Sequence, residues 1–136
     1  MKPNTELIKA AKQASLIAIA PYSGFKVGAA LLSKAGKIFT GCNIEVSSYS
    51  LTICAERVAL FKALSEGVRE FDRMAIYAET ENFCPPCGAC RQVLWDFARD
   101  LTIVLINKKN EQREMKIANL YPDAFDDKYL SGRKHL

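Results

Sequence analysis

Apolar residues recur along the chain with two different periods, and these periods predict alternating helices and strands. From Asn4 to Ala20 they recur every three or four positions, which is typical of an amphipathic helix, and Pro21 follows as its end. Val27–Leu32 and Lys37–Cys42 are apolar runs with Gly36 in the short connection between them, which indicates a β-hairpin. The N-terminal part of the chain is therefore expected to place a helix beside two antiparallel strands.

The middle of the chain continues the alternation. A second helix is expected to begin around Thr52–Cys54 and to end before Gly67, which is placed for a C-terminal cap. Met74–Ala78 and Leu101–Ile106 are short apolar runs typical of buried strands, and Ala89–Arg99 between them has helical spacing. This strand-helix-strand unit predicts two parallel neighbouring strands with a right-handed crossover.

Two further elements complete the pattern. A last strand is predicted near Arg113–Lys116, and a short helix over Ile117–Leu120. The order of elements predicts an α/β fold with three α/β/α layers, in which helices cover a mixed sheet of about five strands. Gly28 and Gly41 lie inside or at the ends of the first two strands, where glycine indicates a bulge or a close approach of the backbone to a ligand.

Length and composition fit one globular domain over residues 1–136. Of the 136 residues, 49% are hydrophobic and 25% charged, and a chain of this length buries roughly two-thirds of its unfolded surface. It has five cysteines, an odd number, and no secretory signal at its head, so a disulfide framework is not expected. The only histidine, His135, is the penultimate residue, which disfavours histidine-based catalysis and histidine-rich metal sites.

Charge and hydropathy indicate neither a nucleic acid nor a membrane as partner. Nineteen Lys and Arg against fifteen Asp and Glu give a net charge of +4, spread along the chain. The densest basic pairs, Lys108–Lys109 and Arg133–Lys134, are typical of a hairpin tip and a tail. The longest apolar stretch, Leu16–Pro21, is far shorter than the roughly 20 residues of a membrane span. Without a signal peptide or a lipidation motif, a cytoplasmic protein is expected.

Two short segments that contain cysteine carry the candidate chemistry. Cys54–Glu56 and Pro86–Cys90 both fall at predicted helix starts. There the unpaired backbone N–H groups and the positive end of the helix dipole favour a thiolate, which is the form that binds metal. A C-x-x-C pair alone is compatible with half of a structural zinc site, a thioredoxin-like redox pair or ordinary buried cysteines.

A third cysteine favours a catalytic zinc ion. Three protein ligands, Cys54, Cys87 and Cys90, would leave the fourth tetrahedral position of Zn²⁺ open, whereas a structural site is closed by four. Glu56 lies too near Cys54 in sequence to be a comfortable fourth ligand of the same ion. It is better suited to act as acid and base beside a bound water.

These segments also carry a resemblance to a known family. The chain resembles the zinc-dependent nucleoside and nucleobase deaminases, and more closely the small homotetrameric cytidine deaminases. The likeness covers nearly the whole chain, and the all-cysteine ligand set points to the branch that acts on free nucleosides. Five separated segments match in order: Ala20–Leu32, Gly41–Glu45, Cys54–Arg57, Pro86–Val93, and Leu120–Pro122 with Phe125.

The resemblance implies a reaction and a cofactor. Cytidine and 2′-deoxycytidine would be hydrolysed to uridine and 2′-deoxyuridine plus ammonia, in pyrimidine salvage. One Zn²⁺ per subunit, held by Cys54, Cys87 and Cys90, would lower the pKa of its water, and the resulting hydroxide would attack C4. Glu56 would accept the proton and return protons to N3 and to the departing ammonia. Because three thiolates outweigh the charge of Zn²⁺, Arg57 and the helix N-termini are expected to withdraw charge by hydrogen bonding to sulfur.

The resemblance also implies which residues bind the substrate. Asn43 and Glu45 match a pair that binds the 3′-hydroxyl of the ribose. Phe25 matches an aromatic residue that packs against the pyrimidine ring, and the backbone of Ala55 lies where the family reads the edge of the base. Phe125 matches a tail residue that reaches into a neighbouring subunit's site, which implies a homotetramer with shared sites.

One part of the chain departs from the resemblance. Tyr49 matches the loop at the subunit interface, but Val46–Ser48 stands where small residues are expected. The nearest alternative is a deaminase of another cytosine-containing substrate, such as an aminoacylated nucleoside antibiotic or a base in nucleic acid. The segment Asn43–Glu45 argues against both, because it specifies a free sugar hydroxyl.

Other classes of function explain fewer residues. A redox protein would use the C-x-x-C pair but would explain neither Cys54 nor Glu56. A zinc-stabilised binding module without catalysis would leave Glu56 unused, as would a closed structural site in which Cys42 and Cys84 took part in place of Cys54. Cys42 and Cys84 are therefore expected not to bind the metal.

Overall fold

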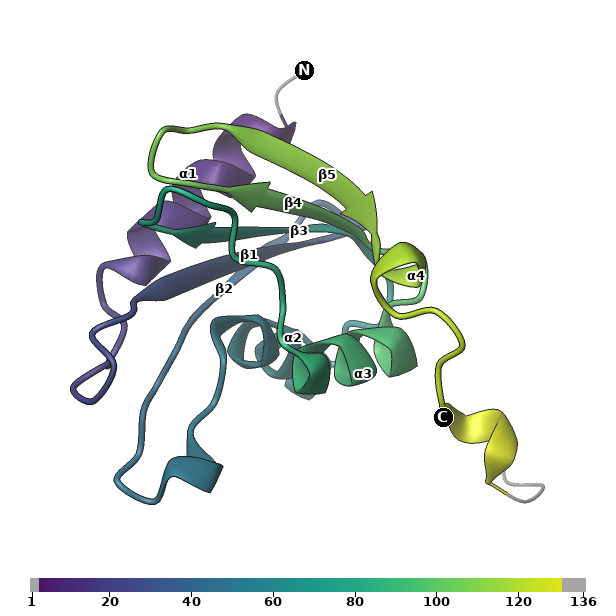
Figure 1. Ribbon diagram of the computed structural model, residues 1–136. Coiled ribbons are helices and arrows are strands. Elements are labelled where there is room, and N and C mark those ends of the chain that lie inside the picture. Colours follow the sequence, from purple (N-terminus) through teal and green to yellow (C-terminus); the bar gives the residue numbers. More distant parts are fainter. Residues whose placement is uncertain (1–2, 131–136) are drawn as a thin grey trace.

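Five strands form one mixed sheet with helices on both faces (Figure 1). The computed structural model describes residues 3–130. This architecture confirms the expected three-layer α/β/α fold. Its elements are, in chain order, α1 (Pro3–Ser15), β1 (Val27–Ser33), β2 (Ile38–Cys42), η1 (Tyr49–Leu51), α2 (Ala55–Ser65), β3 (Phe71–Ala78), α3 (Gly88–Phe97), β4 (Thr102–Ile106), β5 (Gln112–Lys116), α4 (Ile117–Leu120) and η2 (Asp127–Tyr129).

The sheet has the strand order β2-β1-β3-β4-β5. Strand β1 pairs antiparallel with β2 and with β3, which confirms the hairpin, and β5 pairs antiparallel with β4. Strands β3 and β4 are parallel, with Met74 opposite Ile103, so the predicted parallel neighbours are also confirmed. The carboxyl ends of β3 and β4 therefore meet at one edge of the sheet, and the chain leaves β3 there to enter α3.

Helices cover the two faces of the sheet from opposite sides (Figure 1). On one face, Leu7 of α1 is fully buried against Val104. On the other face, Leu60 of α2 and Leu94 of α3 join Ile103 in a larger apolar cluster. Helices α2 and α3 therefore lie in the same layer, so their N-terminal ends can contribute to one site.

Two strand glycines allow the helices to lie directly on the sheet. A Cβ atom on Gly28 would lie 2.0 Å from the carbonyl oxygen of Ala11 in α1, and one on Gly41 would lie 2.4 Å from that of Ala55 in α2. Both distances are far below van der Waals contact, so a side chain at either position would displace a helix. The close approach predicted at these glycines is present, but helix backbone makes it rather than a ligand.

The first helix ends earlier than the sequence predicts, at Ser15 rather than Ala20. Beyond Ser15 the backbone N–H groups donate to carbonyl groups three residues back, as in a turn, and Ile19 then pairs with Ile44 in a parallel bridge. Ala18 continues the apolar spacing of Ala11 and Ala14, although the helix has already ended at Ser15. Periodicity therefore could not mark the end of this helix.

Smaller differences concern element ends. The strand predicted from Met74 begins at Phe71, and the helix predicted over Ala89–Arg99 spans Gly88–Phe97. Within residues 3–130, the helices are too short or too polar to cross a membrane. The basic pair and the histidine expected in an exposed tail, residues 133–135, lie outside the described part of the chain.

Candidate metal and substrate site

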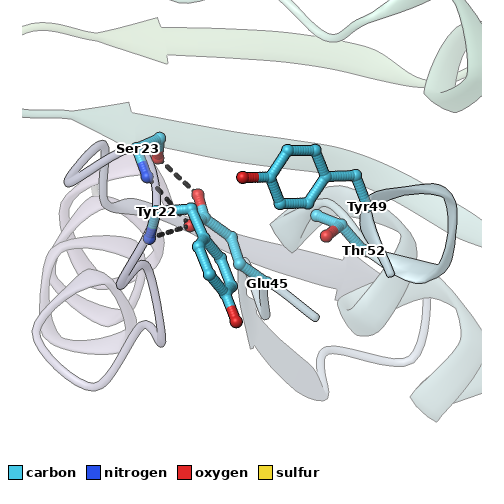
Figure 2. A pocket seen from close by; sticks show the side chains of 5 residues that line it. All are labelled: Tyr22, Ser23, Glu45, Tyr49 and Thr52. Carbon is cyan, nitrogen blue, oxygen red and sulfur yellow. Dashed lines mark hydrogen bonds between the residues drawn. The ribbon is translucent and has the colours of Figure 1, made fainter. Parts of the chain in front are cut away.

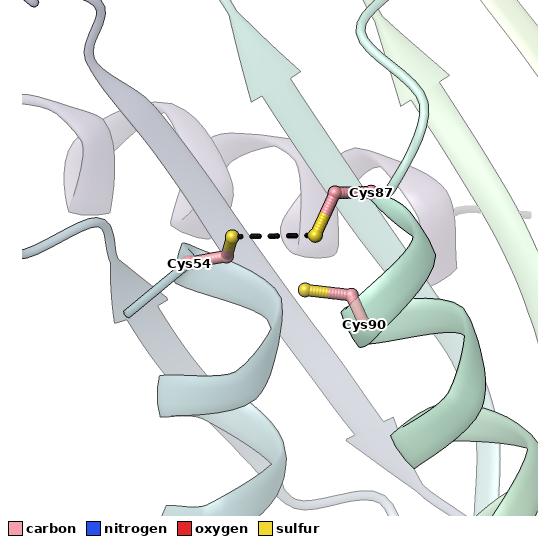
Figure 3. Close-up of side chains that lie close together, drawn as sticks. All are labelled: Cys54, Cys87 and Cys90. Carbon is pink, nitrogen blue, oxygen red and sulfur yellow. Dashed lines mark hydrogen bonds between the residues drawn. The ribbon is translucent and has the colours of Figure 1, made fainter. Parts of the chain in front are cut away.

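Three thiols meet where α2 and α3 begin. Cys54 is the N-cap residue of α2, Cys87 is that of α3, and Cys90 lies in the first turn of α3. Their Sγ atoms all lie within 4.8 Å of one another, and the Sγ atoms of Cys54 and Cys87 are 3.6 Å apart (Figure 3). Thiolates at about 2.3 Å from a tetrahedral Zn²⁺ lie about 3.8 Å apart. The three thiols therefore fit one zinc ion and leave its fourth position open.

The thiol cluster is arranged to carry negative charge. The pKa of Cys54 is lowered to about 5, first by its hydrogen bond with Cys90 and then by its hydrogen bond with Arg57. The pKa of Cys90 is raised by the same Cys54 contact and by burial. Of Cys54 and Cys90, Cys54 is thus the thiol that ionises first, and the N-terminal ends of α2 and α3 add partial positive charge beside it.

Arg57 lies one helical turn after Cys54 and faces its sulfur. Its Nη2 donates to Cys54 Sγ at 3.5 Å. This hydrogen bond raises the pKa of Arg57 further, so the guanidinium stays protonated. Its Nε is buried and has no hydrogen-bond partner within residues 3–130. The guanidinium therefore contacts the sulfur of Cys54, and its role in withdrawing charge stays a prediction.

Glu56 is a buried carboxylic acid beside the thiols. Its side chain is 4% exposed, and burial raises its pKa to about 7. It lines a cavity of about 200 Å³ at the start of α2. Two of the metal-ligand candidates and three of the expected substrate contacts share this cavity with Glu56. These five lining residues are Cys54, Cys87, Phe25, Asn43 and Ala55.

Asn43 has a structural task in this cavity that the sequence did not show. Its Oδ1 accepts a hydrogen bond from the backbone N–H of Val27 at 2.9 Å, and its Nδ2 donates to the carbonyl oxygen of Phe25 at 2.7 Å. These bonds hold the segment that places Phe25 at the cavity. One N–H and one oxygen lone pair of the amide remain for a ligand.

Glu45 lies in a second cavity, of about 340 Å³ (Figure 2). Its carboxylate accepts hydrogen bonds from the backbone N–H groups of Tyr22, at 2.9 Å, and Ser23, at 3.1 Å, and from the Ser23 hydroxyl. The Ser23 hydroxyl is the main cause that lowers the pKa of Glu45, so this residue is an ionised acceptor. Thr52 lines both cavities, which are therefore adjacent.

Two aromatic residues expected at a subunit boundary are exposed. Phe125 is 55% exposed on the C-terminal segment, which extends beyond α3 and α4, and it does not line the cavity of its own chain (Figure 1). Tyr49, in η1, is 70% exposed, and its ring lies 5.4 Å from that of Tyr22. Within one chain, Phe125 therefore lies apart from the cavity that Glu56 lines.

The two remaining cysteines differ in their surroundings. Neither belongs to the group of three thiols. Cys42 donates to the carbonyl oxygen of Ile17 at 3.7 Å, away from that group. Cys84 lines the Glu56 cavity, and burial raises the pKa of its thiol to about 11. Sequence reasoning missed the cavity positions of Cys84 and Thr52, and the only available signal was that Cys84 shares a loop with Cys87.

Comparisons with known proteins agree with this geometry. The model of the cytidine and deoxycytidylate deaminase zinc-binding region matches residues 1–106. A cytidine deaminase from Sporosarcina psychrophila is 50% identical over 127 residues, 93% of this chain and 93% of that protein. A blasticidin-S deaminase from Bacillus cereus is 33% identical over 104 residues, 71% of this chain and 74% of that protein. The crystal structure of a cytidine deaminase from Burkholderia pseudomallei has a TM-score of 0.87 at 50% identity, and the match covers 89% of this chain and 98% of that one. The chain therefore belongs to the zinc-dependent cytidine and deoxycytidylate deaminase family.

Proposed function

We propose that the protein is a cytidine deaminase that hydrolyses cytidine and 2′-deoxycytidine to uridine and 2′-deoxyuridine plus ammonia, in pyrimidine salvage. The observation that carries this proposal is the meeting of three thiols and the buried carboxyl group of Glu56 at one cavity. The relatives named cytidine deaminase, at 50% identity over most of the chain, support the same conclusion.

Cys54, Cys87 and Cys90 hold one Zn²⁺ per subunit in this proposal. When bound, zinc supplies a Lewis acid that lowers the pKa of a water molecule. Three thiolates carry more negative charge than the ion neutralises, which weakens this effect. The hydrogen bond from Arg57 to Cys54 Sγ draws electron density from the sulfur and offsets part of that loss.

Glu56 moves protons between water and substrate. A pKa of about 7 lets the carboxyl group accept and return a proton near neutral pH. It accepts one proton of the attacking water and delivers it to N3 of the pyrimidine. It then accepts the proton of the hydroxyl group formed on C4 and delivers it to the departing ammonia. Because each step restores the form that the next step needs, one carboxyl group serves both tasks.

The neighbouring side chains hold the nucleoside. Phe25 packs against the pyrimidine ring, and the backbone of Ala55 binds the edge of the base. Glu45 is an ionised acceptor whose position is fixed by Tyr22 and Ser23, which suits a sugar hydroxyl donor. Asn43 assists with the part of its amide that the backbone leaves available. The adjacency of the two cavities supports one extended nucleoside site.

The protein forms a homotetramer with shared sites in this proposal. Several large apolar side chains are exposed, among them Leu16 and Ile17 at 73% and Leu51 at 67%, and contiguous apolar surface is typical of protein interfaces. Residues 1–136 form a single catalytic domain, and the enzyme works in the cytoplasm without a nucleic acid or membrane partner. The basic pair Lys108 and Lys109 forms ion pairs with Glu81, which supports the absence of a nucleic-acid partner.

A second substrate is supported by one relative. The Bacillus cereus protein is named a blasticidin-S deaminase, so this family also includes an enzyme for a nucleoside antibiotic. Glu45, held ready for a sugar hydroxyl, favours cytidine. We expect kcat/KM for cytidine to exceed that for blasticidin S, and the opposite order would reverse the assignment.

The proposal is tested by the loss of ultraviolet absorbance of cytidine, with zinc content measured on each sample. The zinc-loaded wild type should be active. Glu56→Gln keeps the shape of the side chain but cannot accept a proton, so it should bind one zinc ion per subunit and lose activity by about 10⁴-fold. An inactive wild type with full zinc content, or a fully active Glu56→Gln variant, would contradict the proposal.

A further inference from the structure

The C-terminal segment that carries Phe125 is fastened to one face of α3. Gln92 and Trp95 are three residues apart, which places both on one side of the helix. Arg99 follows the end of α3, and its Nε donates to the carbonyl oxygen of Trp95 at 3.1 Å. Gln92 Nε2 donates to the carbonyl oxygen of Phe125 at 2.9 Å, and Trp95 Nε1 donates to Asp126 Oδ2 at 3.1 Å. The segment is thus attached to the same helix that carries two of the thiols.

Asp126 is the centre of this attachment. It is 5% exposed and is the only buried residue among residues 121–130. Besides the bond from Trp95, Oδ2 lies 3.5 Å from Arg99 Nη2, and Oδ1 accepts from the backbone N–H of Lys128 at 3.1 Å, which starts η2. The hydrogen bond from Trp95 is the main cause that lowers the pKa of Asp126, so the anchor is an ionised acceptor. Such charge-assisted bonds fix geometry more firmly than neutral ones.

Two aromatic rings next to this buried anchor face outward. Phe125 and Tyr129 are 55% and 60% exposed, and their rings are stacked with centroids 5.5 Å apart and planes 13° apart. A terminal segment ordinarily loses conformational entropy when it becomes ordered at a binding site. Attachment of Asp126 to Trp95 removes that cost before Phe125 meets a partner.

We propose that Asp126, bound to Trp95 and Arg99, is a positioning residue that holds Phe125 where it contacts the pyrimidine in a neighbouring subunit. The inference rests on the proposed function and on its shared sites. Phe125 would contact the base through apolar surface, equally in the bound substrate and in the transition state. Loss of the anchor should therefore weaken binding and leave the chemical step unchanged.

The first test is Asp126→Asn, which removes the charge and keeps the size of the side chain. We expect KM for cytidine to rise by about tenfold while kcat stays within about twofold of the wild type. The matched control is Asp123→Asn, the same change on an exposed residue of the same segment. Asp123 has φ 54°, which asparagine tolerates, so both constants should remain unchanged.

The second test uses Trp95, the only tryptophan of the chain. Its fluorescence spectrum should shift in Asp126→Asn, because the negative charge beside the indole N–H is lost. It should not shift in Asp123→Asn. Trp95→Phe removes the donor and keeps an aromatic ring, so it should also raise KM with zinc content and oligomeric state unchanged. It carries the test by itself if Asp126→Asn does not fold.

Two results would overturn the inference. The first is an unchanged KM in both Asp126→Asn and Trp95→Phe. The second is a fall in kcat or in zinc content that accompanies the rise in KM, since that pattern indicates general loss of structure. Failure of the proposed function is distinguishable from either, because the zinc-loaded wild type itself would then be inactive on cytidine.

Discussion

Arg57 is the residue proposed to adjust the metal site without binding the metal. Its guanidinium donates to Cys54 Sγ at 3.5 Å, while its Nε is buried without a hydrogen-bond partner within residues 3–130. An unpaired buried donor costs free energy. The arrangement is therefore unfavourable for folding alone, which supports the role proposed for Arg57 at the thiols.

Arg57→Ala should keep the zinc ion and lose most turnover. The three thiols are still present, so zinc content should stay at one per subunit. Without the hydrogen bond to Cys54, more negative charge remains on the sulfurs and kcat should fall by roughly 10 to 100-fold. Arg57→Lys keeps the charge but not the planar guanidinium group, so its kcat should lie between those of the wild type and Arg57→Ala. Unchanged turnover in a zinc-loaded Arg57→Ala enzyme would show that the guanidinium has no such role.

At this scale the sequence predicted which thiols lie together, but not the contacts of the side chains around them. Cys54 and Cys87 could be assigned because both precede helices, which is a local feature of the chain. The placement of Glu45 could not be predicted, because it depends on the bridge between Ile19 and Ile44, which joins distant segments. In the same way, the burial of Asp126 could not be predicted, because it depends on the contact with Trp95, which is distant in sequence.

Among the elements, α2 is the one whose packing on the sheet bears most directly on the candidate site. It supplies Cys54 and Glu56, and it lies on the sheet at Gly41, where a Cβ atom would meet the carbonyl oxygen of Ala55 at 2.4 Å. The height of the first turn of α2 above the sheet is thus set by the absence of a side chain on β2. The position of Cys54 relative to α3 depends on that height.

Gly41→Ala should weaken both folding and metal binding. The added methyl group must displace α2, at a cost of roughly 1–3 kcal/mol in the free energy of unfolding. We expect zinc affinity to fall as well, because Cys54 moves with the helix. Gly28→Ala is the matched control: its Cβ would meet α1 at 2.0 Å, so stability should fall while zinc affinity remains. Equal zinc affinity in both variants, measured by competition with a chelator, would contradict this account.

Element types were predictable where the apolar pattern changes sharply. The parallel pair β3 and β4 follows from two apolar runs with a helical segment between them. The end of α1 was not predictable, since Ala18 extends the helical pattern beyond Ser15, where the helix ends.

For the molecule as a whole, the proposed metal ligands connect two helices that are separated in sequence by β3. A bound ion that holds both helices stabilises the folded state, because the unfolded chain does not form the site. Removal of zinc with a chelator should lower Tm by more than about 10 °C, on the basis of about 4 kcal/mol at a free zinc concentration near 1,000 times Kd. Cys42→Ser should respond as the wild type does, whereas Cys87→Ser should already have the low Tm and show little response.

Assembly should be visible in mass and in activity. Sedimentation should give four times the chain mass of 15.1 kDa. If Phe125 acts in a neighbouring subunit, specific activity should fall on dilution together with the loss of the tetramer. A monomer with full activity would show that each chain completes its own site.

The two halves of the proposed nucleoside site have different kinds of support, and this has an evolutionary consequence. The thiols and Glu56 belong to the first turns of two helices packed on the core. Glu45 is held instead by a turn at Tyr22 and Ser23, outside any regular element. Turns accept substitution and insertion more readily than packed helices. A lineage can therefore acquire a new substrate by changing this turn while its hydrolytic chemistry is inherited intact.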